Sequence, residues 1–320
     1  MEASLGARLF ANSPSDVGMV IKIGQDFPND ALTELQSWAT KLDIIQVQDQ
    51  PSARGRIEYS VSSDNESANS RPGEREPYQR LTAPLNVTPE DLQGTPNLQA
   101  QAFHFFDKPA AVEEQIHTLL TLRSRESALP KPFIIWEPHP RSCTPENLSA
   151  HQSIANLVDV FSPNHHELAA FFPQPKTSTF SPHLIESQAR KFLSTAPTQS
   201  NNKCLLIRAA EHGSLLLTTS SNPPVWLPAF HPPDSGKVVD PTGAGNAFLG
   251  ALVLGWLETG DWIEAAKFGA VAASFVIEQV GAPGVVWAGD GGRWNGENVR
   301  VRLGEYAMRV GARREGRVRG

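Results

Sequence analysis

Short apolar runs of strand length alternate with longer amphipathic stretches through the first half of the chain. The runs that we expect to form strands lie at residues 18–23, 43–48, 102–106, 132–137 and 158–161. Between them, apolar side chains recur at intervals of three and four residues, which predicts helices over residues 30–42, 111–125 and 145–157. Strands that alternate with helices are typical of an α/β domain built on a mainly parallel sheet.

The pattern changes after residue 200, where apolar runs follow one another without a helix between them. These runs lie at residues 204–208, 214–219 and 225–230, and helices are predicted around 243–259 and 261–280. Consecutive strands joined by short connections pair antiparallel, because a parallel pair needs a long crossover. We therefore expect a short antiparallel addition at one edge of the parallel sheet.

Length and composition fit one large α/β domain or two small ones, because the chain has 320 residues, of which 40% are hydrophobic and 19% are charged. We expect one domain over residues 1–290 and an arginine-rich tail over residues 291–320. Residues 60–77 are polar and rich in turn formers, so we expect a disordered insertion loop there.

Several features predict a cytoplasmic protein that does not enter a membrane. Cys143 and Cys204 lie far apart and outside any Cys-x-x-Cys spacing, so neither a disulfide framework nor a zinc site is predicted. The longest apolar run, at residues 248–257, is about half the roughly 20 residues that cross a bilayer. The first residues lack the apolar core of a secretory signal.

The formal charge of −6 makes nucleic acid an unlikely partner for the body of the protein, because neutralising phosphates takes clustered lysine and arginine. The C-terminal end is the exception, with Arg313, Arg314, Arg317 and Arg319 close together. We favour a solvated tail over a nucleic-acid or membrane contact for this end.

The strongest chemical signal is the stretch Asp-Pro-Thr-Gly-Ala-Gly-Asn at residues 240–246, which leads directly into a predicted helix. Gly243 and Gly245 allow a tight turn at the helix start, where unpaired N–H groups and the helix dipole attract an anion such as a phosphoryl group. The alternative is a purely structural turn. A Walker A loop is excluded because no Gly-Lys-Ser/Thr occurs, and a dinucleotide fingerprint because the βαβ context is missing.

Polar residues also follow two of the predicted strands, at the edge where an open α/β sheet binds its ligand. Asn164 and Glu167 lie three residues apart at a predicted helix start, which suits a hydrated Mg²⁺ or, alternatively, a helix cap. Glu137 and Arg141 follow another predicted strand. They either face the same crevice or belong to a structural turn.

Taken together, these segments resemble the PfkB family of carbohydrate kinases, in the family's order, over about residues 5–285. The matching segments are Gly-Ala-Arg-Leu-Phe at 6–10, Gly-x-Asp at 24–26, Asn-x-x-Glu at 164–167 and Asp-Pro-Thr-Gly-Ala-Gly at 240–245. The residues at 135–138 and 273–283 resemble a fungal branch of this family. The resemblance implies a ribokinase-like fold, a three-layer α/β/α domain with a central mostly parallel sheet and a β-sheet lid that is reduced or incomplete here.

The resemblance also implies a reaction and its ligands. The reaction is phosphoryl transfer from ATP to a small sugar-like alcohol, with Mg²⁺ and a monovalent cation, K⁺, as cofactors. Gly243, Ala244 and Gly245 would form the anion hole that holds the transferred group. Asn164 and Glu167 would bind Mg²⁺. A homodimer is compatible with the family, whose lid often pairs subunits.

A second group of residues is assigned to K⁺ and the nucleotide by the same resemblance. Asp240 and Thr242 would lie at the monovalent-cation site. Contacts to ATP are implied for Thr242, Gly213, Ala273 and Ile277. The last two belong to the predicted helix that would line the adenine pocket.

Three departures separate this chain from the family pattern. The family's catalytic base is an aspartate, but Asn246 stands at that position and has no carboxylate to take a proton. In the family, a first strand, lid elements and a Gly-Gly substrate motif precede Gly-Ala-Arg-Leu-Phe, whereas this chain begins almost there, which we expect to reflect either a truncated N-terminus or a misassigned start codon. Residues 208–213 keep only the last glycine, Gly213, of the family's Thr-x-Gly-x-x-Gly nucleotide turn.

We therefore predict a PfkB-type protein that binds MgATP and phosphorylates a sugar-like alcohol slowly or only in its full-length form. General-base catalysis contributes about 10²–10⁴-fold, and Asn246 does not supply it. Phosphoryl transfer relies mainly on positioning and electrostatics, so some turnover is compatible with this loss. The alternative is a non-catalytic nucleotide-binding scaffold or regulatory protein that kept the fold.

Overall fold

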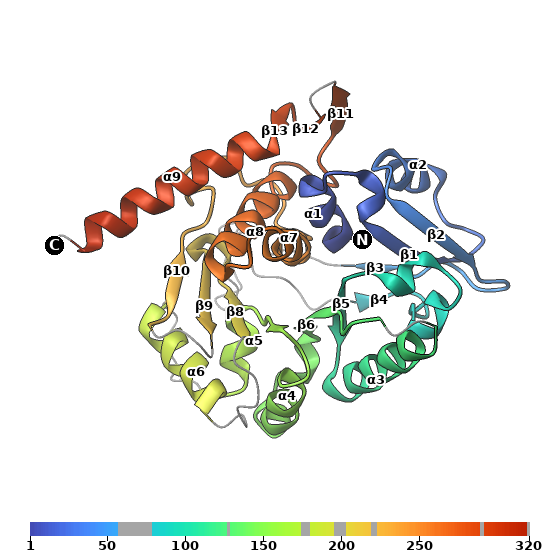
Figure 1. Cartoon of the computed structure of the whole chain (residues 1–320), viewed down its shortest axis with the longest axis horizontal. Helices are drawn as coiled ribbons and strands as arrows, with labels where there is room; N and C mark the ends of the chain where they lie inside the picture. Colours follow the sequence, from blue (N-terminus) through green and yellow to red (C-terminus); the bar gives the residue numbers. More distant parts are fainter. Residues whose placement is uncertain are drawn as a thin grey trace, which may run out of the picture.

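A central sheet of six strands runs through the molecule in the order β10-β9-β8-β7-β6-β5 (Figure 1). The computed structural model describes residues 1–56, 79–126, 129–173, 180–194, 203–218, 223–288 and 291–318. The six strands are β5 (Ala102–Asp107), β6 (Phe133–Pro138), β7 (Val160–Phe161), β8 (Cys204–Arg208), β9 (Ser214–Thr218) and β10 (Val225–Leu227). Strands β5 to β8 pair in parallel, whereas β9 is antiparallel to β8 and β10 to β9. The predicted parallel sheet and its antiparallel addition are both confirmed.

Helices cover both faces of this sheet and make three layers (Figure 1). On one face lie α3 (Pro109–Glu126), α4 (Leu148–Ala155), α5 (His165–Ala170) and α6 (Pro182–Ser194). On the other lie α1 (Glu2–Phe10), α7 (Ala244–Thr259), α8 (Trp262–Val276) and α9 (Val299–Val318). Alternate side chains of β8 enter different cores: Cys204 and Leu206 meet the α7–α8 side, and Leu205 and Ile207 the α3–α6 side. The predicted α/β/α architecture is therefore confirmed.

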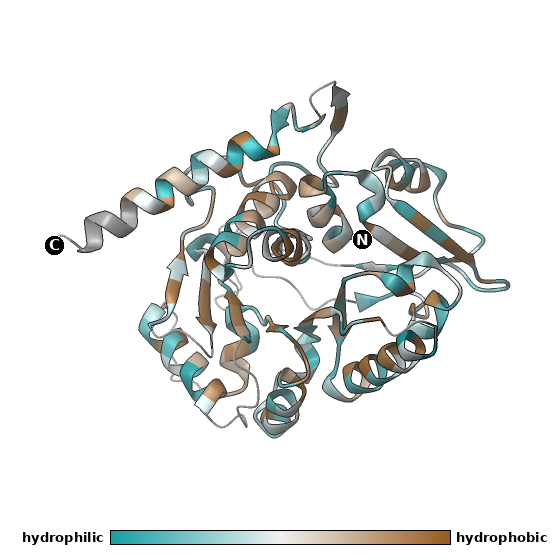
Figure 2. Ribbon diagram, viewed as in Figure 1, coloured by the Kyte–Doolittle hydropathy of each residue, from teal (hydrophilic) through white to brown (hydrophobic). Residues whose placement is uncertain are grey.

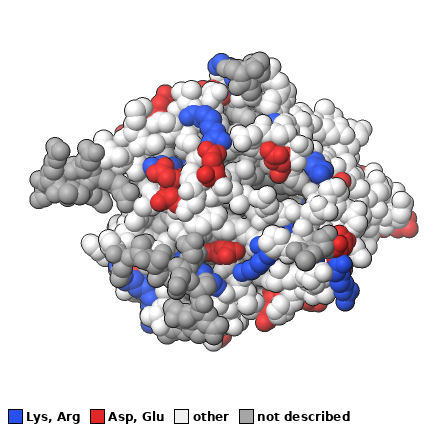
Figure 3. All heavy atoms as spheres, in the orientation of Figure 1, with Lys and Arg blue, Asp and Glu red and all other residues white. Residues whose placement is uncertain are grey.

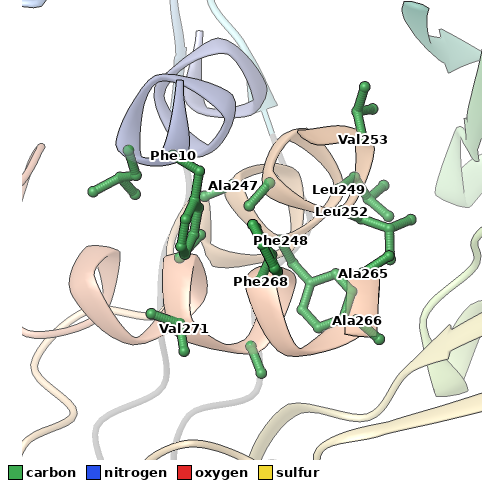
Figure 4. Close-up of a cluster of buried hydrophobic side chains, with 14 of the residues drawn as sticks. Phe10, Ala247, Phe248, Leu249, Leu252, Val253, Ala265, Ala266, Phe268 and Val271 are labelled. Carbon is green, nitrogen blue, oxygen red and sulfur yellow. The ribbon is translucent and has the colours of Figure 1, made fainter. Parts of the chain in front are cut away.

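Small residues let α1, α7 and α8 pack closely in one of these cores. Figure 4 shows Phe10 of α1, Phe248 of α7 and Phe268 of α8 gathered where the three helices meet. Gly250 of α7 faces the backbone of α1, where an added Cβ atom would lie 1.7 Å from the Ala3 carbonyl oxygen. Figure 2 shows α7 as strongly apolar, as expected for a helix with neighbours on several sides.

Three small sheets of the described residues stand beside the central one. The first pairs β1 (Gly18–Ile23) with β2 (Lys41–Gln46) in parallel, and α2 (Asn29–Ser37) lies between them in the chain. The second pairs β3 (Gly55–Arg56) with β4 (Gln79–Arg80), and it is antiparallel. The third is also antiparallel and contains β11 (Val285–Ala288), β12 (Gly291–Trp294) and β13 (Glu297–Asn298).

The helix predicted over residues 30–42 is wrong at its C-terminal end. Helix α2 ends at Ser37, the Trp38 side chain is buried, and Ala39 has a positive φ of 55° that turns the chain toward β2. The residues that follow pair with β1, so strand pairing overrides the local helical pattern there. The insertion loop expected at residues 60–77 lies outside the described residues.

The segment after residue 290, expected to be a tail, contributes packed structure. Trp294, Tyr306 and Val310 are buried in the core that α7 and α8 share. Arg302 is buried beside them, and its Nη1 atom pairs with Glu278 Oε1 at 2.8 Å. Side chains beyond residue 312, which include the C-terminal arginines, lie outside the described part of the protein.

Charges of both signs share the surface. Figure 3 shows acidic and basic side chains interspersed over the face in view, without a large area of one sign. None of the helices in the described ranges is long and apolar enough to cross a bilayer. Cys143 and Cys204 are buried free thiols, and burial raises the pKa of the Cys143 thiol to about 12.

Candidate active site

Polar side chains meet where the parallel strands β6, β7 and β8 end. Glu137 lies near the end of β6, Ser162 and Asn164 follow β7, and Arg208 is the last residue of β8. Asn164 also forms an isolated parallel bridge with Arg208, which extends the pairing of these strands. The first turn of α7 faces the same edge, because Asn246 hydrogen-bonds to Glu137. This is the edge at which open α/β sheets bind ligands.

The start of α7 has the geometry of an anion cradle. Gly243 precedes the helix with a left-handed φ of 81°, which glycine adopts without strain. The Ala244 N–H donates to the Pro241 carbonyl oxygen at 3.3 Å, but no described hydrogen bond uses the N–H of Gly245 or of Asn246. These two groups lie at the positive end of a 16-residue helix. The cradle, defined here as residues 243–246, therefore offers two backbone donors.

Arg208 lies against the cradle. Its Nη1 atom is 2.3 Å from the point that a Cβ atom of residue 245 would occupy, so Gly245 is needed for this approach. Glu137 Oε1 accepts from Nη1 at 2.7 Å, while Ser162 accepts from Nε through Oγ at 3.2 Å and from Nη2 through its carbonyl at 2.8 Å. Nη2 is also 3.8 Å from Glu167 Oε2. An anion at the cradle would therefore meet a fixed positive charge as well as backbone donors.

Glu137 joins the cradle to the sheet. Its side chain is 7% exposed, and Oε2 accepts a hydrogen bond from Asn246 Nδ2 at 2.7 Å. His104 Nε2 of β5 is 3.4 Å from the same oxygen, within reach of an ion pair but without hydrogen-bond geometry. Burial alone would raise the pKa of Glu137, but the Arg208 charge and then His104 outweigh burial and lower this pKa to about 2. The Glu137 carboxylate is therefore ionised at neutral pH.

Asn164 and Glu167 form a reciprocal cap at the start of α5. Asn164 Oδ1 accepts from the Glu167 N–H at 2.9 Å, and Glu167 Oε2 accepts from the Asn164 N–H at 2.7 Å. This is the capping alternative that the sequence left open. The Glu167 carboxylate near the cradle still fits a hydrated Mg²⁺, which takes most of its ligands from water and phosphate oxygens. No group of three or more acidic, His or Cys side chains in the described ranges could hold a metal ion.

The segment that enters the cradle is anchored to the end of α8. Ile277, the residue after α8, accepts hydrogen bonds through its carbonyl from the N–H of Val239 at 2.7 Å and of Asp240 at 3.2 Å. Asp240 Oδ1 accepts from the Thr242 N–H at 2.9 Å, a turn that stiffens this approach. Asp240, Thr242 and Ile277 are thus linked in the structure, and Ala273 lies one helical turn earlier on α8.

The local backbone accounts for the glycine at position 213. It lies between β8 and β9 with a φ of 90°, and an added Cβ atom would be 2.0 Å from the Leu227 carbonyl oxygen. The described contacts do not join Gly213 to the cradle. Arg141 belongs to the 3₁₀ turn Pro140–Ser142, where its backbone N–H donates to His139 Nδ1 at 3.2 Å, whereas Glu137 is part of the cluster.

Two residues at the site were not assigned from the sequence. Arg208 stood out only as a departure from a nucleotide turn, although an arginine at the end of a buried strand is a usable signal for an anion site. Glu2 of α1 packs on Gly243, with its Cγ atom 2.6 Å from the point that a Cβ atom would occupy. This second contact joins residues 241 positions apart in the sequence, so no local pattern reveals it.

The fold is ribokinase-like: a mostly parallel sheet lies between two helix layers, and a glycine-rich helix start faces the strand ends. The structure is similar to ribokinase from Giardia lamblia, with a TM-score of 0.63 at 19% identity over 88% of this chain and 82% of that one. The chain belongs to the pfkB family of carbohydrate kinases, whose family model matches residues 3–287.

Two fungal proteins are similar to this chain along most of its length. An uncharacterized protein of Schizosaccharomyces pombe is 31% identical over 325 residues, which cover 95% of this chain and 84% of that protein. Protein MAK32 of Saccharomyces cerevisiae is 27% identical over 302 residues, which cover 91% of this chain and 78% of MAK32. The resemblance to a fungal branch of the family is therefore confirmed.

Proposed function

We propose that this protein binds MgATP at the cradle and transfers the γ-phosphoryl group to a hydroxyl of a small sugar-like alcohol. One observation carries the proposal: the Arg208 guanidinium lies against Gly245, beside two backbone N–H groups that no described hydrogen bond uses. A transferring phosphoryl group spreads negative charge over its oxygens, and preorganised donors of this kind stabilise that charge. Membership of a carbohydrate kinase family supports the same reaction.

The neighbouring residues would serve the ligands around the phosphoryl group. Glu167 would hold Mg²⁺ through its carboxylate, while Asn164 fixes the start of α5 as its cap. Mg²⁺ would supply neutralisation of the phosphate charge. Asp240 and Thr242 would lie at a monovalent-cation site, and the end of α8 up to Ile277 would face the adenine.

Turnover is expected to be slow because Asn246 stands where the family has a carboxylate. Loss of a general base costs about 10²–10⁴-fold in rate. In the proposed reaction, the hydroxyl oxygen bonds to phosphorus as the bond to ADP breaks, and the hydroxyl proton leaves to an oxygen of the transferred group. Arg208 and the backbone donors retain the positioning and electrostatic parts of the catalysis.

Calorimetric titration of MgATP into the purified protein tests the binding step. Gly245→Asp places a carboxylate in the cradle beside Arg208 and should abolish saturable binding. Gly304→Asp is the matched control, because it adds the same charge on α9, where no atom lies within 4 Å of an added Cβ. This control should bind as the parent does. A parent protein without saturable binding would contradict the proposal.

A second assay distinguishes turnover from binding alone. ADP release is measured with a panel of sugars and polyols at saturating MgATP. Release that depends on one acceptor supports a kinase. Saturable binding without such release supports the alternative of a non-catalytic nucleotide-binding protein, which the asparagine at residue 246 favours.

A further inference from the structure

The buried Glu137 carboxylate and the half-buried Asn246 amide form a pair between β6 and α7. Asn246 Nδ2 lies 2.7 Å from Glu137 Oε2. An ionised carboxylate only accepts hydrogen bonds, so the amide must turn its nitrogen toward Glu137. The amide oxygen then faces away from Glu137, and no described hydrogen bond uses it.

The carboxylate is held from two further directions. Glu137 Oε1 pairs with Arg208 Nη1 at 2.7 Å, and His104 Nε2 is 3.4 Å from Oε2. Arg208 is fixed in turn by two hydrogen bonds to Ser162. A rotation of the Glu137 side chain would disturb all these contacts together. The Asn246 amide is therefore anchored to a rigid group that the sheet supports.

We propose that Glu137 is a positioning residue of the reaction centre, which orients the Asn246 amide oxygen toward the acceptor hydroxyl and makes asparagine the compatible residue at position 246. The role of the hydroxyl rests on the proposed function, whereas the pairing does not. A carboxylate at position 246 would face Glu137 at the distance of the present hydrogen bond. Two carboxylates so close, one of them buried, do not both ionise, so one of them would keep a proton.

The single change Asn246→Asp therefore does not restore a base. It adds a negative charge beside Glu137 that Arg208 compensates only in part. The Glu167 carboxylate is already a second negative charge beside Arg208, with its Oε2 atom 3.8 Å from Nη2. The double change Glu137→Gln with Asn246→Asp exchanges the two groups and leaves the net charge unaltered. It lets the new amide donate to the new carboxylate.

Chemical denaturation tests the pairing without any nucleotide. The parent, both single variants and the double variant are compared from about pH 4 to about pH 8. Asn246→Asp should be less stable than the parent at neutral pH, and the deficit should shrink as the pH falls. The reason is that a carboxyl group whose pKa is raised by folding contributes stability only while it stays protonated.

The double variant should regain most of the stability at neutral pH and lack this pH dependence. Glu137→Gln alone should be destabilised across the range, because Arg208 loses its carboxylate partner. The pairing would be overturned if the loss of stability caused by Asn246→Asp did not change with pH. It would also be overturned if the double variant were no more stable than the Asn246→Asp variant.

Turnover tests the orientation of the amide. At saturating MgATP, the double variant should release acceptor-dependent ADP about 10²-fold faster than Asn246→Asp, because an ionised carboxylate then stands at position 246. The affinity for MgATP should be equal in both. Equal affinity with equal rates would overturn the positioning role. A parent that does not bind MgATP would refute the proposed function together with this role, while the denaturation series would still decide the pairing.

Discussion

The contact between α1 and α7 leaves no space for a side chain at Gly250. An added Cβ atom would lie 1.7 Å from the Ala3 carbonyl oxygen and 3.0 Å from the Ala7 nitrogen. Gly6 makes the reciprocal contact, where a Cβ atom would lie 1.9 Å from the Ala247 carbonyl oxygen. The obstacles are helix backbone atoms, which no rotamer change removes. Restoring ordinary contact therefore requires α1 to move by about 1.5 Å, which loosens the packing along α7.

The expected cost of Gly250→Ala follows from two opposing terms. Overpacking costs about 1–3 kcal/mol, and the upper end applies to a clash with backbone. The higher helix propensity of alanine stabilises the folded state by about 1 kcal/mol relative to glycine. We therefore expect the free energy of unfolding to fall by about 2 kcal/mol.

Denaturation by urea, followed by tryptophan fluorescence, measures this change. Gly304→Ala on α9 is the matched control, because no atom lies within 4 Å of an added Cβ there. The control should raise the free energy of unfolding by about 1 kcal/mol through helix propensity alone. Equal effects of the two changes, or stabilisation by Gly250→Ala, would refute the close packing of α1 on α7.

Two further predictions concern buried charges. Burial would raise the pKa of Glu278, but hydrogen bonds from its neighbours and the Arg302 charge lower it from 4.5 to about 2. Its contribution to stability is present above about pH 4.5 and is lost as the pH falls toward 2, so Glu278→Gln should remove this acid dependence in denaturation experiments. Arg123 donates to three backbone carbonyl oxygens, and Arg123→Met should cost about 3 kcal/mol because these acceptors lose their partner. The exposed Arg125→Met should have little effect on the denaturation midpoint, and an equal effect would contradict this explanation.

The sheet was predictable because its signals are local. The run Cys-Leu-Leu-Ile ends in Arg208, and the strand has the bounds predicted for it, since a strand covered on both faces is apolar at successive positions. Helix α2 shows where such signals fail. Its amphipathic pattern continues past Ser37, but residues from Lys41 onward pair with β1, a partner that periodicity does not identify.

The site was predictable only in part, for the same physical reason. The glycine-rich turn at Gly243 is local and is present with the expected left-handed backbone. The hydrogen bond between Asn246 and Glu137 joins residues 109 positions apart, so the sequence contains both groups without indicating that they meet. Asn164 and Glu167 were open to two interpretations because a helix cap and a metal site use the same residue types at the same spacing.

Arg208 and Asn246 look like independent departures from the family pattern, yet the structure couples them through Glu137. A neutral residue at position 208 would leave the Glu137 carboxylate buried without its main counterion, which is strongly unfavourable. With Arg208 present, Glu137 stays ionised, and an ionised Glu137 favours an amide over a second carboxylate at position 246. The charges of this site therefore depend on one another. Arg208 on β8 keeps Glu137 on β6 ionised, and the ionised Glu137 favours an amide at position 246 on α7.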